Sequence, residues 1–561
     1  MPQGSRFRLP TAGRDLWLAA AGFVALAIAA TWPLGRALST SLPADYGDPL
    51  FVTWVMAWVA RHFTRALQGD VGALASMWDA PIFVPEANTL AYSEHFAGQA
   101  FQALSIYWLT GNPLLAYNLI FLSTFVLSGL GAYLLVRELT GSRLGGAVAG
   151  ALFAVNQYRG ASLSHLHTLS AHWVPIALWG LLVFARSGSR RALAVGALGV
   201  VALNTSSGYY MLYFGPFIAA FTLVALTQHT AWRSRSGWVA LTLAGIAVAL
   251  VQVPFVLPYL ELQRATQFAR GRAEVEQFSL TLDLYRSQVA YWAPALLLSA
   301  AALLAWRRPA AAPRWAVGFF AVAGVLGVWL SLGPVPRLNG APAGLPGLYD
   351  LLFTYVPGYS GLRVASRFAM VLTLALAVLA GIGAAELARR GRRAGAMLAA
   401  AAALAHLVLQ WTGPIPLNGP IRGADLHATP GYLRPSAEVP DIYRFVAATE
   451  PSAVLVELPF GDPEYELRYM FFGLAHERPL LNGYSGVFPP SYRRRAALLA
   501  DPPANSAGAW EALEPATHVL VHTGAWDDDR RTRIGQWLAA HGASAVVERD
   551  GAVLWHLPST R

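Results

Sequence analysis

Apolar residues gather into twelve stretches along the chain up to about residue 411, and polar loops separate them. Several stretches are shorter than the roughly 20 residues that a straight membrane-spanning helix needs, so their ends are soft. The pattern predicts a polytopic α-helical membrane protein with eleven or twelve crossings. The stretches are 15–37, 95–110, 113–136, 144–157, 167–186, 190–203, 208–228, 236–258, 289–306, 313–332, 365–388 and 394–411. The first one lacks a cleavage site, and we expect it to remain as an anchor.

Arginine marks one set of the connecting loops. Short Arg-rich loops stay on the cytoplasmic side, so the N-terminus is expected inside and everything after 412 outside. The loop arginines are Arg6, Arg8, Arg14, Arg137, Arg143, Arg186, Arg190, Arg191, Arg233, Arg235, Arg307, Arg308, Arg314, Arg389, Arg390, Arg392 and Arg393. Arg137 and Arg143 lie on the cytoplasmic side only if one of the earlier stretches does not cross the membrane. The weakest candidate is 95–110, which carries Gln99 and Gln102; eleven crossings are then expected, or twelve if the charge rule is broken at that loop.

The longest early polar interruption, 38–94, is unusually rich in ionisable groups for a chain that is 13% charged. With its border it contains Asp45, Asp48, Asp79, Glu86, Glu94 and His95. Carboxylates at a bilayer surface are costly to desolvate and often serve proton transfer, cation binding or substrate orientation, although a merely solvated acidic loop is the alternative. The run Asp45-Tyr-Gly-Asp48-Pro offers one general base and one orienting carboxylate. The next stretch, with Trp54 and Trp58, predicts a helix in the membrane interface.

Beyond Trp411 the composition changes, with fewer long apolar runs and more Asp, Glu, Pro and His. Residues 452–460 and 517–525 predict buried strands and 529–542 a helix. Residues 544–557 predict a hairpin that turns at Asp550-Gly551. We therefore expect a membrane domain at 1–411, which includes the outer loop 38–94, and a small α/β domain at 412–561.

Composition excludes several classes of function. The chain has no cysteine, which removes disulfides, thiolate metal sites and cysteine nucleophiles. The net charge of +10 comes largely from loop arginines, so it reports orientation in the membrane and predicts no nucleic-acid partner. No glycine-rich phosphate loop precedes a helix, which argues against an ATP-driven pump.

Two further candidate groups lie in predicted outer loops. Ser164-His165-Leu-His167, with His172 nearby, can bind zinc, hydrogen-bond a substrate or sit at a helix start, and these alternatives stay open. Arg363 and Arg367 are four residues apart at the start of a span. On one helical face they would form a phosphate clamp, and the alternative is anchoring to anionic headgroups.

Four patches carry a resemblance to a known family. They are GDPLFVTWVMAW, FVPEANTLAYSEH, PGYSGLRVASRF and LPFGDPEYELRYMFFGLAHERPLLNGYSGVFPPSY. With the long first span, the acidic first outer loop and the C-terminal outer domain, the chain resembles the GT-C superfamily of membrane glycosyltransferases, in an uncharacterised bacterial branch. It lacks the Trp-Trp-Asp type signature of the oligosaccharyltransferases and the paired acids of the mannosyltransferases.

The resemblance implies an enzyme of the bacterial inner membrane that transfers a sugar from a polyprenyl-phosphate carrier, with membrane lipids around it. By that analogy Asp48, or Asp45, is the base, and Arg363 and Arg367 bind phosphate. Further substrate-binding candidates are Glu94, His95, His165 and His167. No cofactor is certain, a divalent cation stays open, and the sugar and acceptor are unknown.

Two other functions compete with this interpretation. A flippase or assembly factor for lipid-linked saccharides would use a similar scaffold, but a transporter should carry polar groups at mid-membrane, whereas charges here lie at segment ends. A phospho-group transferase acting on lipid headgroups would need more clustered carboxylates than the sequence offers.

Overall fold

The computed structural model describes residues 13–229, 234–266, 269–419, 436 and 438–558. The chain forms two compact units. Met1–Trp32 and Phe121–Pro414 make the helical unit, and Pro33–Ile120 and Ile415–Arg561 make the mixed unit. The predicted division at 411/412 lies close to the boundary at 414/415, but residues 33–120, which include the outer loop 38–94, cluster with the C-terminal region.

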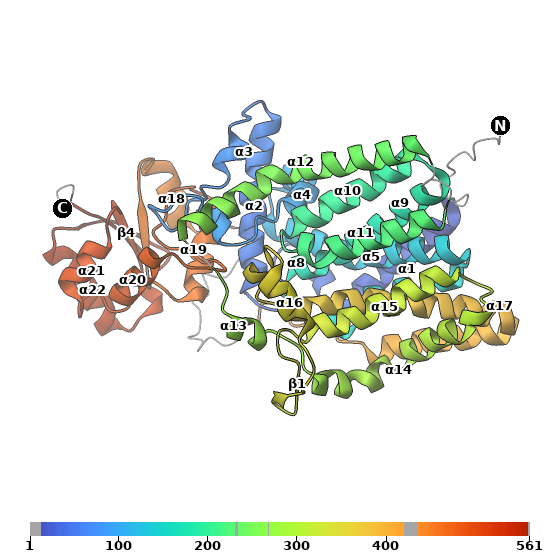
Figure 1. The fold of residues 1–561 in the computed structure, drawn as a ribbon. Helices are drawn as coiled ribbons and strands as arrows, with labels where there is room; N and C mark the ends of the chain where they lie inside the picture. Colours follow the sequence, from blue (N-terminus) through green and yellow to red (C-terminus); the bar gives the residue numbers. More distant parts are fainter. Residues whose placement is uncertain (1–12, 230–233, 267–268, 420–435, 437, 559–561) are drawn as a thin grey trace. The chain divides into compact units, whose positions relative to one another are not determined.

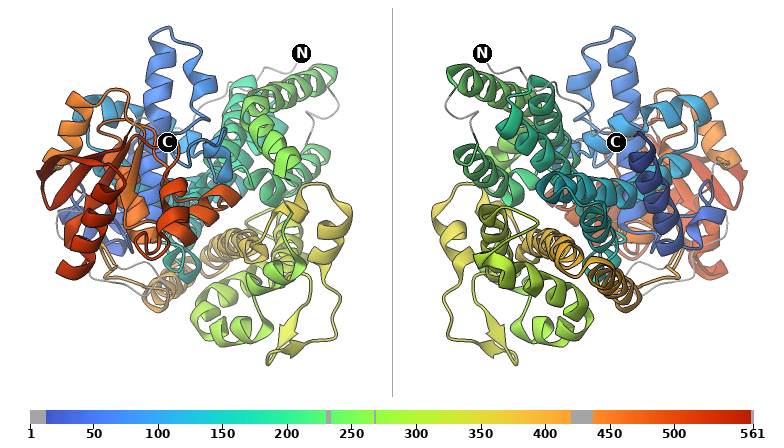
Figure 2. Two further views of the ribbon diagram at one scale, coloured as in Figure 1. Left: turned by 90° about the vertical axis from the view of Figure 1, so that its left-hand side faces the viewer. Right: turned by 90° about the vertical axis from the view of Figure 1, so that its right-hand side faces the viewer.

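The helical unit consists almost entirely of α-helices, which run side by side in Figure 1 and are seen close to end-on in Figure 2. It contains α1 (Gly13–Ala30), most of α5 (Pro113–Thr140), α6 (Arg143–Ala154), α7 (Gln157–Gly160), α8 (Leu166–Leu169), α9 (Trp173–Ser187), α10 (Arg190–Ser206), α11 (Tyr210–Thr227), α12 (Arg235–Thr266), α13 (Arg272–Gln277), α14 (Leu282–Leu304), α15 (Arg314–Ser331), α16 (Leu348–Tyr355) and α17 (Ala369–Leu409). A two-residue ribbon pairs β1 (Arg337–Leu338) with β2 (Ala341–Pro342).

Eight helical segments among the described residues are long and apolar enough to cross a membrane. One of them contains α17, whose backbone leaves the helical region at Arg392 (φ 46°, ψ −122°), so α17 is two helices joined at a kink. The two halves of α17 correspond to two of the predicted apolar stretches. The shorter helices α4 (Ala97–Thr110), α6 and α10 correspond to three more, so all twelve predicted stretches are helical. The prediction of a polytopic helical protein is confirmed.

Helix α17 is the centre of the helical unit and packs against α6, α14 and α15. Its contact with α6 depends on two glycines. A Cβ on Gly145 would lie 2.6 Å from the carbonyl oxygen of Gly381, and a Cβ on Gly381 would lie 2.5 Å from that of Gly145. Small residues let helix backbones approach closely in membranes, where apolar burial alone does not hold helices together.

The arginine-rich loops gather at one end of the helical unit. Asp15, at the start of α1, pairs with Arg143 at 2.5 Å and with Arg137 at 3.6 Å. Arg389 donates hydrogen bonds to the carbonyl oxygens of Thr140 and Ala310. Four of the Arg-bearing segments therefore share one end, as the charge rule requires. Arg6, Arg8 and Arg233 lie outside the described residues.

These contacts bear on the choice between the two predicted numbers of membrane crossings. The C-terminal end of α5, at Arg137, lies beside the start of α1, at Asp15. If α1 and α5 both span the bilayer, the chain between them makes no net crossing. The alternative with eleven crossings is favoured, in which 95–110 is the segment that does not cross.

The mixed unit contains a four-stranded sheet in the order β3-β4-β6-β5. Its elements are α2 (Asp48–Leu67), α3 (Ala73–Ser76), α4, α18 (Asp441–Thr449), β3 (Leu455–Leu458), α19 (Pro463–Gly473), α20 (Pro490–Leu499), α21 (Ser506–Ala512), β4 (His518–His522), α22 (Asp528–Ala540), β5 (Ser544–Arg549) and β6 (Ala552–His556). Strands β3 and β4 are parallel, and the other pairs are antiparallel. The predicted strands, helix and hairpin are confirmed, with Asp550 (φ 51°) and Gly551 (φ 69°) at the turn.

The acidic segment 38–94 is built into this unit. The backbone of Phe83 and Val84 donates to the carbonyl oxygens of Asn482 and Leu480. Helix α2 is largely buried and packs against α19 and α4. Trp54 and Trp58 are 2% and 8% exposed, and the indole of Trp58 donates to the carbonyl oxygen of Met77. Both tryptophans are therefore buried inside the unit. That α2 lies in the membrane interface stays a prediction.

Candidate active site

Asp45 and Asp48 flank the turn that starts α2. Asp48 is the first residue of the helix and Pro49 follows it, a position that suits proline because the first helical N–H groups have no partner within the helix. A carboxylate of Asp45 accepts a hydrogen bond from the N–H of Gly47 at 2.8 Å. Ala44, just before it, has a φ of 65°. Strained backbone of this kind is often found at functional sites.

The two carboxylates have different surroundings. Asp45 is 9% exposed, whereas Asp48 is partly exposed in the first turn of α2, where the helix dipole favours a negative charge. The side chain of Tyr117, fully buried near the start of α5, interacts electrostatically with both acids. The structure thus brings the two predicted acids together around one tyrosine that the sequence did not single out.

Glu94 and His95 lie in the short segment before α4, and both are buried, at 8% and 2% exposed. The Nδ1 atom of His95 accepts a hydrogen bond from the N–H of Ala97 at 3.0 Å. Its ring lies 5.7 Å from that of Trp78. Burial lowers the pKa of His95 to about 3, so the imidazole is neutral and carries its proton on Nε2. Such a group can donate a hydrogen bond to a neutral or anionic ligand, and the substrate-binding role stays a prediction.

In the helical unit the structure brings His167 and Arg367 together. Arg367 Nη2 lies 2.5 Å from His167 Nε2, and its guanidinium lies 5.7 Å from the ring centroid of Tyr209. The neighbouring His165 is exposed, and its ring is 5.6 Å from that of His167. His165 occupies the N-cap position of α8, but its side chain makes no capping hydrogen bond. A guanidinium against Nε2 also opposes zinc at that nitrogen, because the two cations would repel.

Arg363 and Arg367 do not share a helical face, contrary to the sequence prediction. Arg363 lies in an irregular segment, Arg367 lies in a 3-10 turn (Ala365–Phe368), and α17 begins only at Ala369. The Arg363 guanidinium lies 3.9 Å from a carboxylate oxygen of Glu274 and 5.2 Å from the ring centroid of Phe278. The two arginines therefore have different ion-pair and ring partners, but both act electrostatically on His167. Their joint binding of a phosphate stays a prediction.

Arg159 was missed by the sequence reasoning. It is 5% exposed, and it donates to the carbonyl oxygen of Leu169 at 3.1 Å and to the hydroxyl of Thr124 at 3.0 Å. Its guanidinium lies 4.6 Å from the ring centroid of Phe125. The signal that marked Arg363, an arginine in a predicted outer loop, applied equally to Arg159.

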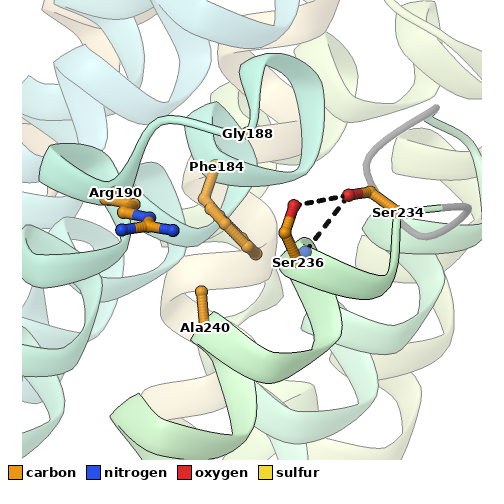
Figure 3. Close-up of a pocket in the computed structure, with 7 residues that line it drawn as sticks. Phe184, Gly188, Arg190, Ser234, Ser236 and Ala240 are labelled. Atoms are coloured by element: carbon orange, nitrogen blue, oxygen red, sulfur yellow. Dashed lines mark hydrogen bonds between the residues drawn. The ribbon is translucent and has the colours of Figure 1, made fainter.

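Two other features of the described residues, their clusters of possible metal ligands and a pocket, add no second candidate site. Among the described residues, no three His, Asp or Glu side chains gather closely enough to hold a metal ion, and we derive no step through one. A pocket is lined by Phe184, Gly188, Arg190, Ser234, Ser236, Gly237 and Ala240 (Figure 3). The hydroxyls of Ser234 and Ser236 are 2.7 Å apart there. The pocket belongs to the arginine-rich end and contains none of the predicted site residues.

Comparisons with known proteins identify the fold. No protein-family model and no curated protein matches the sequence. Among solved structures, the arabinofuranosyltransferase AftD from mycobacteria is similar, with a TM-score of 0.57 and 15% identity, over 98% of this chain and 42% of that chain. The chain thus spans about two fifths of the length of AftD.

Two structures of ArnT from Cupriavidus metallidurans are also similar. The apo structure has a TM-score of 0.46 and 13% identity, over 96% of this chain and 97% of that chain. The structure bound to undecaprenyl phosphate has a TM-score of 0.45 and 14% identity, over 97% and 98%. The likeness to AftD shows that this chain shares the fold of a solved arabinofuranosyltransferase, and it agrees with the polytopic helical fold that the sequence predicts.

Proposed function

We propose that this chain is a membrane glycosyltransferase that moves a sugar from a polyprenyl-phosphate carrier to an acceptor on the outer face of the bacterial inner membrane. One observation carries the proposal: a chain with the fold of AftD places Asp45 and Asp48 around the buried Tyr117 at the start of α2. Because fold alone does not determine function, the roles below depend on the contacts of each residue.

Asp48 is the proposed general base. The acceptor hydroxyl attacks the anomeric carbon of the sugar, and its proton passes to the Asp48 carboxylate. The new carbon–oxygen bond forms as the bond to the carrier phosphate breaks, and the phosphate leaves with the electron pair. A general base of this kind contributes on the order of 10² to 10⁴ in rate.

Asp45 is the proposed orienting residue. Its carboxylate already accepts a hydrogen bond from the Gly47 N–H, two residues along the chain. Such a bond fixes the turn that presents Asp48. Asp45 is also more buried than Asp48, which leaves it less accessible to a substrate hydroxyl.

Arg367 and Arg363 are proposed to bind the carrier phosphate, on the evidence of contacts within the helical unit. Arg367 contacts the neutral imidazole of His167, and a neutral partner does not offset the charge of the guanidinium. Arg363 is about 41% exposed in its side chain and shares the Glu274 carboxylate with Arg270, so its charge is only partly offset. His165, His167, Glu94 and His95 remain proposed substrate contacts. A requirement for a divalent cation is an open proposal.

A deletion strain tests this function. Without the protein, a lipid-linked sugar should accumulate in the membrane and be detected by mass spectrometry. The wild-type gene should clear the intermediate, and a gene encoding Asp48→Asn, at matched protein level, should not. Clearance by a variant with both Asp45→Asn and Asp48→Asn would overturn the enzymatic proposal and favour the flippase or assembly role.

A further inference from the structure

A C-terminal segment of the mixed unit contacts α2 at three points, from the turn before the helix to Arg61. Near the start of α2, the Arg468 guanidinium lies 4.9 Å from the ring centroid of Tyr46. One turn into the helix, the rings of Phe51 and Tyr484 are 5.7 Å apart. Near its end, Arg61 donates to the carbonyl oxygen of Leu474 at 2.6 Å. The segment that supplies these three partners is part of the longest patch of the GT-C resemblance, and the proposed reaction uses none of it.

Arg468 is buried to an unusual degree for an arginine. It is 1% exposed, and its Nη2 donates to a carboxylate oxygen of Glu464 at 3.0 Å, one helical turn earlier in α19. Its Nη1 donates to the carbonyl oxygen of Glu464 at 2.5 Å. Burying such a pair costs several kcal/mol of desolvation for each ion, so a buried pair is weak evidence for stability by itself. Its position against Tyr46 offers a functional reason for keeping it.

Tyr46 follows Asp45 and precedes Gly47, within the turn that joins the two acids. Its N–H donates to the carbonyl oxygen of Gly419 at 2.9 Å, and the N–H of Gly419 donates to the carbonyl oxygen of Ala44 at 2.8 Å. A Cβ on Gly419 would lie 2.6 Å from that oxygen, so this approach requires glycine. The backbone of the turn is thus held by residue 419, and the side chain of Tyr46 is held by Arg468.

We propose that Arg468 is a positioning residue for the Asp45–Asp48 turn, acting through the ring face of Tyr46, with Glu464 holding the guanidinium in place. This inference depends on the proposed function of Asp48. A cation over an aromatic face is attracted to it most strongly when both groups are desolvated, as they are here. A misplacement of about 1 Å at a reacting group costs on the order of 10²-fold in rate.

The experiment compares kcat and KM for purified variants, with the lipid-linked sugar from the deletion strain as the donor and membranes of that strain as the acceptor source. Tyr46→Phe keeps the ring face and should retain clearly more activity than Tyr46→Leu. Tyr46→Leu, Arg468→Lys and Glu464→Gln should lower kcat by about tenfold or more, with the donor KM within about twofold, because the turn is displaced while donor binding is intact. The matched control is Arg478→Lys, since Arg478 donates to the carbonyl oxygen of Ala447, away from α2.

The outcomes separate this inference from the proposed function. Glu464→Gln, which keeps the side-chain shape, decides the test if Tyr46→Leu or Arg468→Lys fails to fold. Wild-type kcat in Glu464→Gln, or a loss in Tyr46→Phe equal to that in Tyr46→Leu, would overturn the positioning role. Full activity of Asp48→Asn, in contrast, would overturn the proposed base whatever the Arg468 variants do.

Discussion

Arg367 Nη2 lies 2.5 Å from His167 Nε2, and this contact fixes the state of both groups. The guanidinium can only donate, so Nε2 accepts and the proton of the neutral imidazole is on Nδ1. The hydroxyl of Tyr210 also donates to the carbonyl oxygen of His167, which holds the backbone of α8 in place. A neutral imidazole leaves the charge of the guanidinium in place, which suits the recognition of an anion.

The first prediction concerns Arg367. Arg367→Lys should raise the donor KM by about tenfold, because Lys offers a point charge where Arg offers a planar fork. Arg363→Lys should raise it less, since Arg363 is exposed and lies beside Glu274. Donor titrations on purified variants measure both. Arg337→Lys is the control, because Arg337 lies in β1 and pairs with Glu276. Equal donor KM values across the set would remove the support for a phosphate-binding role.

The second prediction separates the two acids. Asp48→Asn should lower the transfer rate by about 10² to 10⁴, because it cannot accept a proton. Asp45→Asn should keep most activity, because the amide oxygen can still accept from the Gly47 N–H. Asp45→Ala should lose it, because that bond is gone. Single-turnover rates of the three variants measure this, and loss in Asp45→Asn with full activity in Asp48→Asn would exchange the two roles.

The third prediction concerns sidedness. The chain has no cysteine, so single cysteines can be placed without a background signal. A cysteine in place of Gly391 should react with a membrane-impermeant maleimide only in opened cells, because the arginines around it hold that end inside. A cysteine in place of Gly423, which lies outside the described residues, should react in intact cells. Reaction of both on one side would contradict the orientation.

The fourth prediction follows from His95. Its pKa is about 3 in the folded chain and 6.5 when exposed, so the unfolded chain binds a proton that the folded chain does not. His95 therefore costs no stability above pH 6.5 and destabilises the fold as the pH falls toward 3, by at most about 1.4 kcal/mol per pH unit. His95→Gln should lessen the fall of the thermal midpoint between pH 6.5 and 4.5. His476, whose pKa burial also lowers to about 3, should account for part of the remaining fall. An unchanged pH dependence in His95→Gln would contradict the burial argument.

Much of the fold could be predicted because it depends on local patterns. Long apolar stretches predicted the helices. A strand pattern on both sides of the Asp550-Gly551 turn predicted β5 and β6. The helix boundary at Arg363 was missed because the pairing of residues i and i+4 assumed a helix that begins only at Ala369. A local four-residue spacing says nothing about where a helix starts.

The environment of the acids could not be read from the sequence. Tyr117 is about 70 positions from Asp48, and Arg468 more than 400, so only the folded chain brings them to one turn. The burial of α2 was missed for the same reason, because α19, which packs against this helix, is about 400 positions away in the sequence. Long-range pairing of this kind leaves no periodic signal along the chain.

The central claim, that the chain consumes a lipid-linked sugar with Asp48 as base, is tested most directly with purified protein. Wild-type chain and Asp48→Asn are incubated with the lipid-linked sugar from the deletion strain and with that strain's membranes, and free polyprenyl phosphate is followed by mass spectrometry. The account predicts that wild type releases one polyprenyl phosphate for each sugar transferred, and that Asp48→Asn releases about 10² to 10⁴ times less per unit time. An unconsumed lipid-linked sugar with wild-type protein, or equal release by Asp48→Asn, would contradict it.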